Sequence, residues 1–182
     1  MAINIYDICT NPVTGETFKV VSVTPYSFTM RWTVKPGGHT AFEHIHYKQD
    51  EIFRVKKGEL RILIEGKEHI VSIGNMIIVP KGKRHIVYNN SHDVLDTNIE
   101  LRPVLDHPKI TQCFNGLLSD GHVDEKGAIN MPMMLYFLQK MKCKGMARPS
   151  GISASTFKFL LIKYYLLGTF KGWDKLYDKY TK

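Results

Sequence analysis

The sequence predicts a mainly β fold, an antiparallel sandwich or barrel, that is followed by a small α-helical C-terminal extension. Between residues 17 and 101, apolar and polar side chains alternate with a period of two, most clearly over residues 28–34. Turn residues interrupt this part of the chain at intervals of about ten residues, and no helical period lies between them. This combination favours strands that pair in antiparallel fashion.

Each expected strand ends at a turn. Residues 36–38 (Pro-Gly-Gly) close the first strand, residues 65–67 (Glu-Gly-Lys) join the two strands of a hairpin, and residues 80–82 (Pro-Lys-Gly) end a short apolar strand. The expected strands are residues 28–34, 51–57, 60–64, 68–73, 76–79, 85–88 and 94–101. We assign residues 1–103 to this β part.

The pattern changes after Pro103, and four helices are expected at residues 106–118, 130–141, 153–167 and 173–180. Asn130 is an expected N-cap, Ser153 or Ser155 is another, and Gly168 is expected to end the third helix. A basic linker over residues 142–151 joins the second and third helices. Residues 104–182 are therefore expected to form a helical, basic extension that packs on the barrel or mediates contacts.

The positive charge of the chain is concentrated near its C-terminus. The formal net charge is +8, and residues 142–182 contain nine Lys or Arg but only Asp174 and Asp178 as acids. Such an asymmetry is typical of proteins that approach an anionic surface, although a Lys-rich end also simply favours solubility.

Composition and cysteine usage indicate a cytoplasmic protein. Cys9, Cys113 and Cys143 lie far apart and form no CxxC motif, which fits a reducing compartment better than a disulfide framework. The chain has no run of about eighteen uncharged apolar residues, and its N-terminus shows no secretory signal.

A small group of residues points to metal chemistry. His44 and His46 are two apart on an expected strand, so both imidazoles project from one face. Glu51 follows a short turn, and its strand is expected to pair with the first in a hairpin; His85 is a fourth candidate. Three imidazoles and one carboxylate suit a divalent transition metal such as Fe, Mn, Ni or Zn. Octahedral coordination would leave two positions open for water, substrate or dioxygen.

These residues stand in two motifs, Gly38-x5-His44-x-His46-x4-Glu51-x6-Gly58 and Gly74-x5-Pro80-x-Gly82-x2-His85-x3-Asn89. Both motifs resemble those of the cupin superfamily at every fixed position, and the short spacing between them resembles that of compact bacterial cupins. The resemblance implies a cupin-type antiparallel β-barrel, or jelly roll. It also implies that His44, His46, Glu51 and His85 are the metal ligands, whereas Asn89 is structural.

The expected site is mostly apolar. Counting outward from the ligands by alternation gives a substrate pocket formed by Phe42, Phe53, Val55 and Val87, with Trp32 or Met30 beside them. Arg54 is expected to face outward, and no inward cation is evident, which weighs against a sugar-phosphate substrate. The remaining histidines, which are expected at the surface or in loops, are His39, His69, His92, His107 and His122.

The third expected helix is apolar nearly all round over residues 155–167, with Lys158 and Lys163 as its only charges. We expect this helix to pack against the outer sheet or across a homodimer interface. The alternative is a peripheral membrane contact through residues 153–182. Nucleic-acid binding is not expected, because a recognition helix should present polar and basic residues to the groove.

Two functions remain open at this level. The first is a metal-dependent enzyme, dioxygenase-like or an isomerase or decarboxylase, that acts on a small apolar or aromatic molecule. In it Glu51 would serve both as a metal ligand and as a catalytic proton acceptor. The second is a non-catalytic protein that binds or senses a small molecule and uses its basic, apolar tail for membrane or protein contacts.

Overall fold

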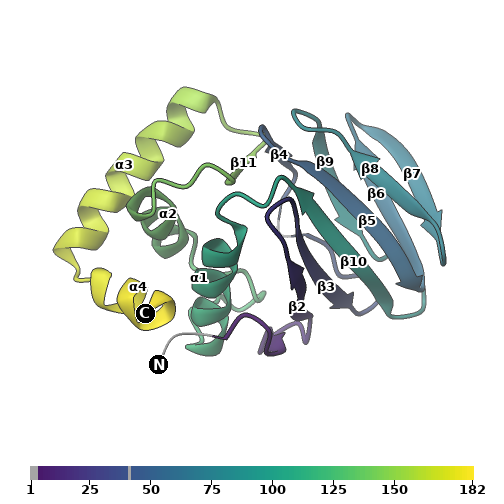
Figure 1. The fold of residues 1–182 in the computed structure, drawn as a ribbon, viewed down its shortest axis with the longest axis horizontal. Helices are drawn as coiled ribbons and strands as arrows, with labels where there is room; N and C mark the ends of the chain where they lie inside the picture. The colour runs from purple at the N-terminus through teal and green to yellow at the C-terminus, as the bar shows by residue number, and fades with distance from the viewer. Residues whose placement is uncertain (1–3, 41) are drawn as a thin grey trace.

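The computed structural model describes residues 4–40 and 42–182. It confirms the predicted fold class: antiparallel β-sheets are followed by C-terminal helices (Figure 1). The strands are β1 (Cys9–Thr10), β2 (Thr17–Val23), β3 (Phe28–Val34), β4 (His44–His46), β5 (Asp50–Lys57), β6 (Glu59–Ile64), β7 (Lys67–Ser72), β8 (Met76–Val79), β9 (Arg84–Tyr88), β10 (Leu95–Arg102) and β11 (Ala147–Pro149). The helices are α1 (His107–Ser119), α2 (Met131–Lys140), α3 (Ala154–Phe170) and α4 (Asp174–Thr181).

The strands form two sheets. One sheet has the order β1-β2-β3-β10-β5-β8 and the other the order β11-β4-β9-β6-β7. Apolar side chains from both sheets meet in one core, which includes Trp32 and Phe53 from the first sheet and Ile62 and Val87 from the second. This shared core explains the two-residue alternation in the sequence, because the strand faces that point into it are buried.

The helices gather beyond one end of the two sheets and have an apolar cluster of their own, which includes Leu117, Phe137 and Leu161 (Figure 1). The helical part contacts the first sheet through α1, where the rings of Phe18 and Phe114 meet edge to face with centroids 5.0 Å apart. Aromatic contacts of this kind add to the apolar area that the packing buries.

Two expected helix caps are present, and one expected helix end is not. The Asn130 side chain accepts a hydrogen bond from the Met133 amide, and Ser153 does the same for Thr156. Gly168, by contrast, lies inside α3, which continues to Phe170. The glycine is needed for packing rather than for termination, since a Cβ there would lie 2.4 Å from the Tyr136 ring.

The expected linker over residues 142–151 contains a strand that the sequence pattern did not indicate. This strand, β11, pairs antiparallel with β4, so that Ala147 lies opposite His46 and Pro149 opposite His44. The backbone amide of Ser150 extends the pairing by donating to the Glu43 carbonyl at 2.9 Å. The C-terminal part of the chain thus completes the sheet beside the two histidines.

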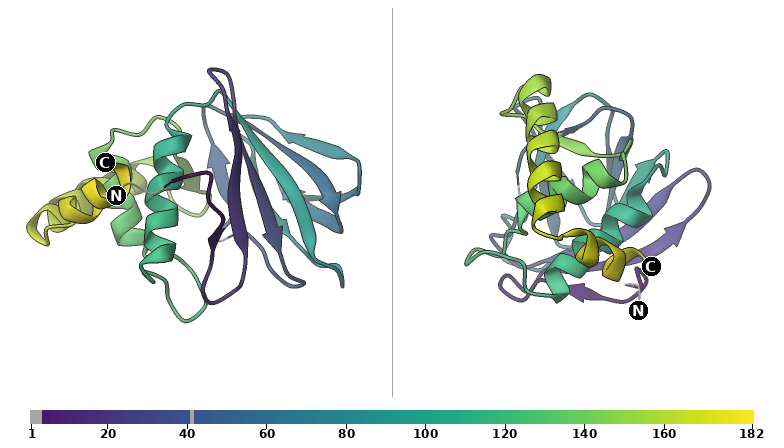
Figure 2. Two further views of the ribbon diagram at one scale, coloured as in Figure 1. Left: turned by 60° about the horizontal axis from the view of Figure 1, so that its bottom comes forward. Right: turned by 90° about the vertical axis from the view of Figure 1, so that its left-hand side faces the viewer.

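The expectation that the apolar third helix packs on the outer sheet is wrong. Helix α3 packs on α2, and Phe157 and Leu161 belong to the same apolar cluster as Leu135. The two views in Figure 2 place α3 on the far side of the helical part from the sheets. Among the residues that the structure describes, no helix has the length and hydropathy needed to cross a bilayer.

Candidate metal centre

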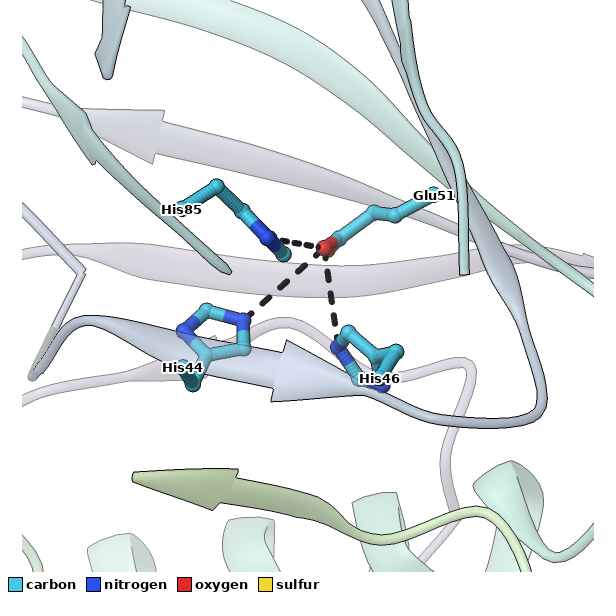
Figure 3. Close-up of side chains that lie close together, drawn as sticks. All are labelled: His44, His46, Glu51 and His85. Atoms are coloured by element: carbon cyan, nitrogen blue, oxygen red, sulfur yellow. Dashed lines mark hydrogen bonds and ion pairs between the residues drawn. The ribbon is translucent and has the colours of Figure 1, made fainter. Parts of the chain in front are cut away.

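The four predicted ligands converge on one point between the two sheets. His44 and His46 lie on β4 and His85 on β9, both in the second sheet, whereas Glu51 lies on β5 in the first. One donor atom from each residue can be chosen so that all four lie within 4.8 Å of one another. Figure 3 shows the three imidazoles around one carboxylate oxygen.

The way in which Glu51 reaches this point corrects one expectation. Strands β4 and β5 do not form a hairpin, because they belong to different sheets. The turn of residues 47–49 carries the chain from the second sheet across to the first, and Gln49 is buried in it. His44 is instead paired across the ladder with His85, and their ring centroids are 4.4 Å apart. The carboxylate therefore faces the imidazoles from the opposite sheet.

Backbone carbonyls orient two of the three imidazoles. Nδ1 of His44 lies 3.0 Å from the Phe42 carbonyl, and Nδ1 of His85 lies 3.1 Å from the Lys83 carbonyl. Since a carbonyl only accepts, each Nδ1 carries a hydrogen and donates it. Nε2 of each ring is thereby directed at the carboxylate. Hydrogen bonds of this kind fix the orientation and protonation of metal-binding histidines.

One oxygen of Glu51 is shared by all three rings. Its Oε2 atom lies 2.7 Å from Nε2 of His85, 3.5 Å from Nε2 of His46 and 3.8 Å from Nε2 of His44. Nδ1 of His46 is buried and finds no hydrogen-bond partner among the described residues. The Oε2 atom of Glu51 therefore faces three imidazole nitrogens.

The protonation states suit a cation. Burial alone would raise the pKa of Glu51, but the neighbouring histidines, led by His46, hold it well below its usual value, so the carboxylate is ionised. Burial lowers the pKa of His46 to about 4, which keeps that imidazole neutral. Burial also acts to lower the pKa of His85, but its hydrogen bond to Glu51 outweighs this and raises it. A metal ion would replace that proton.

His107 corrects the expectation that the remaining histidines lie at the surface or in loops. It is the first residue of α1 and is buried, with its ring centroid 6.0 Å from that of His46 and 5.6 Å from that of Phe28. His39 and His92 are exposed as expected. The signal that could have indicated His107 is weak, because a histidine before a proline at a helix start is usually solvated.

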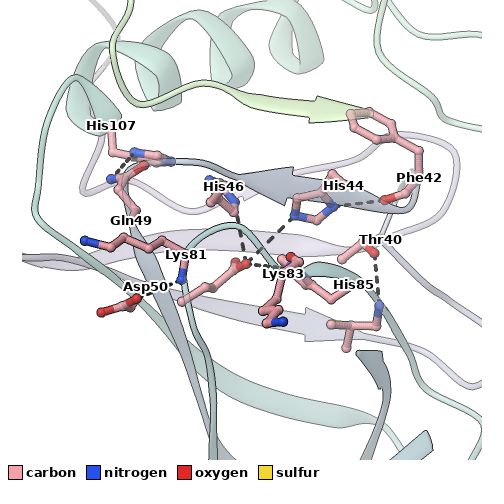
Figure 4. A network of polar contacts seen from close by, with 12 residues as sticks. Thr40, Phe42, His44, His46, Gln49, Asp50, Lys81, Lys83, His85 and His107 are labelled. Atoms are coloured by element: carbon pink, nitrogen blue, oxygen red, sulfur yellow. Dashed lines mark hydrogen bonds and ion pairs between the residues drawn. The ribbon is translucent and has the colours of Figure 1, made fainter. Parts of the chain in front are cut away.

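Gln49 holds His107 in place (Figure 4). Its Nε2 donates to the Pro103 carbonyl at 2.6 Å and lies 3.0 Å from Nδ1 of His107. Burial lowers the pKa of His107 to about 3, so the ring is neutral. Because Nδ1 accepts from Gln49, the single hydrogen of this ring is on Nε2. The helical part thus brings a fixed N–H donor close to His46.

The structure brings some of the expected pocket residues to the cluster, but not all. The ring of Phe42 meets that of His44 with centroids 5.8 Å apart, and the ring of Phe53 meets that of His85 at 6.4 Å. Val87 is fully buried on β9, two residues after His85.

Trp32 lies elsewhere in the core. Trp32 and Val55 both pair with Thr97, so they lie at the same level of the first sheet. Val55 is four residues beyond Glu51 on β5, which places this level about 13 Å farther along the strand. The register instead puts Phe28 at the level of Glu51, since Leu101 pairs with both.

The donor set fits a divalent transition metal. The four side chains offer three neutral or neutralisable nitrogens and one ionised carboxylate, in a buried site where a lone carboxylate would be unfavourable without a cation. The residues that could hold the ion are the four named above.

The comparisons agree with this geometry. Residues 30–97 match the family model described as the cupin domain, and the match contains all four side chains of the cluster. This part of the chain is a cupin domain. The helical part, with His107, lies outside the match. No curated protein matches the sequence significantly.

Solved structures resemble this fold. KdgF from Halomonas sp. is 21% identical with a TM-score of 0.50, and the match covers 59% of this chain and 96% of that one. TT1209 from Thermus thermophilus is 20% identical with a TM-score of 0.44, covering 47% and 80% of the two chains. A sugar phosphate isomerase of the cupin superfamily from Silicibacter pomeroyi is 18% identical with a TM-score of 0.46, covering 50% and 62%.

Proposed function

We propose that this protein is a metal-dependent enzyme that acts on a small, largely apolar or aromatic molecule. The observation that carries the proposal is the convergence of His44, His46, Glu51 and His85, whose donor atoms lie within 4.8 Å of one another. When bound there, a divalent ion would supply a Lewis acid that polarises an oxygen of the substrate.

The surrounding residues would select and orient the substrate. Phe53 and Val87 give the site apolar walls, and the neutral His107 offers an N–H donor that Gln49 keeps in one orientation. Phe42 contacts His44 on one side and lines a cavity of about 560 Å³ on the other, together with residues 121–124 and 128–132. We assign this cavity as the route by which a small molecule approaches the cluster.

The same ligand set supports dioxygenation, isomerisation and decarboxylation, so the residues around the metal decide the class of reaction. Glu51 is better suited to bind a cation than to act as a general base, because its low pKa keeps it ionised and weakly basic at neutral pH. A proton acceptor for the reaction would then come from the substrate side or from solvent.

Metal content tests the ligand assignment. The full-length protein, incubated with Fe(II), Mn(II), Ni(II) or Zn(II) and desalted, is expected to retain about one ion per chain by elemental analysis. The variants His44→Ala and His85→Ala are expected to lose at least about tenfold in affinity, whereas the exposed His39→Ala and His92→Ala serve as matched controls. Undiminished metal in the first pair would overturn the assignment.

Turnover tests the enzyme class. The metal-loaded protein would be assayed for oxygen consumption and for product formation with a panel of phenols, diketones and thiols. Activity that disappears in His44→Ala but not in His92→Ala supports the proposal. Binding of panel compounds without turnover, with any of the metals, would support the second candidate instead.

That second candidate is a non-catalytic protein that binds or senses a small molecule and passes the signal to another surface. The observation that favours it is the exposure of large apolar side chains on α3, among them Phe159 and Phe170, which a self-contained enzyme does not need.

A further inference from the structure

Helix α3 has two different faces. Phe157, Leu161 and Gly168 are buried on the face that packs on α2. On the opposite face, Phe159, Ile162, Leu166 and Phe170 are 64%, 44%, 64% and 91% exposed. Their spacing of three, four and four residues aligns them in one row along the helix, which we call the α3 stripe.

Lysines flank the α3 stripe, and α3 contains no acidic residue. With about 100° of rotation per residue, Lys158 lies about 100° to one side of Phe159 and Lys163 about 40° to the other. Lys171 follows directly after the helix. Long lysine side chains beside an apolar row can extend their charged ends outward while their stems cover apolar surface.

These features point to one occupant. We propose that the α3 stripe lies in the interface of an anionic lipid membrane, with the four apolar side chains inserted and Lys158, Lys163 and Lys171 near the headgroups. A row of large apolar side chains with flanking lysines is typical of helices that lie in the membrane plane. The helix is about 25 Å long, shorter than the hydrocarbon thickness of about 30 Å, so it lies on the surface rather than across the bilayer.

A second copy of this chain fits the stripe less well. Pairing two α3 helices through their stripes would bring Lys158 and Lys163 of both copies together, and α3 offers no carboxylate to neutralise them. An anionic surface removes this repulsion and adds attraction that falls with salt. The position of α3 at the extremity of the molecule, away from the sheets, leaves it free to meet a flat surface (Figure 2).

Vesicle sedimentation of the full-length protein tests the proposal. The protein is expected to sediment with vesicles of phosphatidylcholine and phosphatidylserine, to bind phosphatidylcholine alone much more weakly, and to be released by raised salt. The double variant Lys158→Gln/Lys163→Gln is expected to bind the anionic vesicles about thirtyfold more weakly. The double variant Leu166→Gln/Phe170→Gln is expected to lose at least about tenfold.

The control is Ile70→Gln/Met76→Gln, which changes two exposed apolar side chains on the sheets instead. It is expected to bind like the unmodified protein, and circular dichroism tests whether each variant is folded. Equal binding by the control and the stripe variants would overturn the proposal, as would a failure of the unmodified protein to bind anionic vesicles. A dimer in ultracentrifugation that only the stripe variant dissociates, without vesicle binding, would assign the stripe to a second copy.

Discussion

Gln49 and His107 join the two parts of the chain beside the metal cluster. Gln49 sits in the turn between β4 and β5, and its Nε2 donates to Nδ1 of His107 at the start of α1, 3.0 Å away. The same nitrogen donates to the Pro103 carbonyl at 2.6 Å. One side-chain amide therefore fixes the point at which the helical part leaves the cupin domain and enters α1.

The first prediction concerns this amide. Gln49→Met keeps the side-chain volume but leaves Nδ1 of His107 buried without a donor, so the free energy of unfolding should fall by about 1–3 kcal/mol. Urea denaturation of both proteins measures the difference. Lys48→Met, at the exposed neighbouring position, is the control and should change stability by less than about 0.5 kcal/mol. Equal effects of the two substitutions would show that the amide contributes nothing specific.

A second prediction concerns the packing of α3 on α2. Gly168→Ala improves helix propensity by about 1 kcal/mol, but the new Cβ would lie 2.4 Å from the Tyr136 ring and 2.6 Å from the Trp173 ring. Overpacking should prevail and lower the free energy of unfolding by about 1–2 kcal/mol. Gly151→Ala, where nothing lies within 4 Å of the new Cβ, should be nearly neutral in the same urea titration. A stabilised Gly168→Ala protein would contradict this packing.

A third prediction links stability to pH through Asp120. Burial acts to raise the pKa of Asp120, but hydrogen bonds from Lys179 and Tyr180, each 2.7 Å long, outweigh it and lower the pKa. The pKa of Asp120 is lower in the folded protein than in the unfolded chain, so the ionised carboxylate stabilises the fold. This stabilisation is complete above about pH 4 and is lost as the pH falls through the pKa of the folded state.

Asp120→Asn should therefore cost about 1 kcal/mol at pH 7 and less at pH 2, a modest effect because Lys179 is half exposed. Urea unfolding at the two pH values provides the measurement. Asp178→Asn, which removes the more exposed pair with Lys182, should have a smaller effect at pH 7. A penalty for Asp120→Asn that does not depend on pH would rule out this linkage.

The fourth prediction is that the thiols are unreactive in the folded protein. Cys9, Cys113 and Cys143 are free and buried, and burial raises the pKa of Cys113 and Cys143 to about 12. At pH 8 these two should react with a disulfide reagent at least about a hundredfold more slowly than an exposed thiol, such as that of a Lys67→Cys variant. All three thiols should react rapidly once guanidinium has unfolded the protein. Fast reaction in the native protein would mean that the helical part opens readily.

The sequence predicted the strands well because the core repeats the same local signal. Strands β6 and β9, for example, bury alternate side chains, and glycines at positive φ, such as Gly66 at 79°, mark the turns. The ligand cluster was equally visible, because the spacing of His44 and His46 and the two motifs are local features. What the motifs could not tell is that Glu51 approaches from the opposite sheet.

The features that were missed depend on contacts between distant segments. Strand β11 is three residues long and pairs with β4 about a hundred residues earlier, so its own sequence contains no period to detect. The burial of His107 depends on Gln49, and the continuation of α3 past Gly168 depends on space beside Tyr136. Each of these features is determined by tertiary packing and not by the local sequence pattern.

The pairing of β11 with β4 has a consequence for shortened forms of the protein. A chain cut after Arg102 would keep β4 but would lose β11, leaving the backbone N–H and C=O groups on one side of Ile45 and its neighbours uncovered. Unprotected strand edges are templates for intermolecular β-pairing. A fragment made of the cupin domain alone should therefore aggregate. In the full chain, the C-terminal segment covers the edge of the strand that carries two of the histidines.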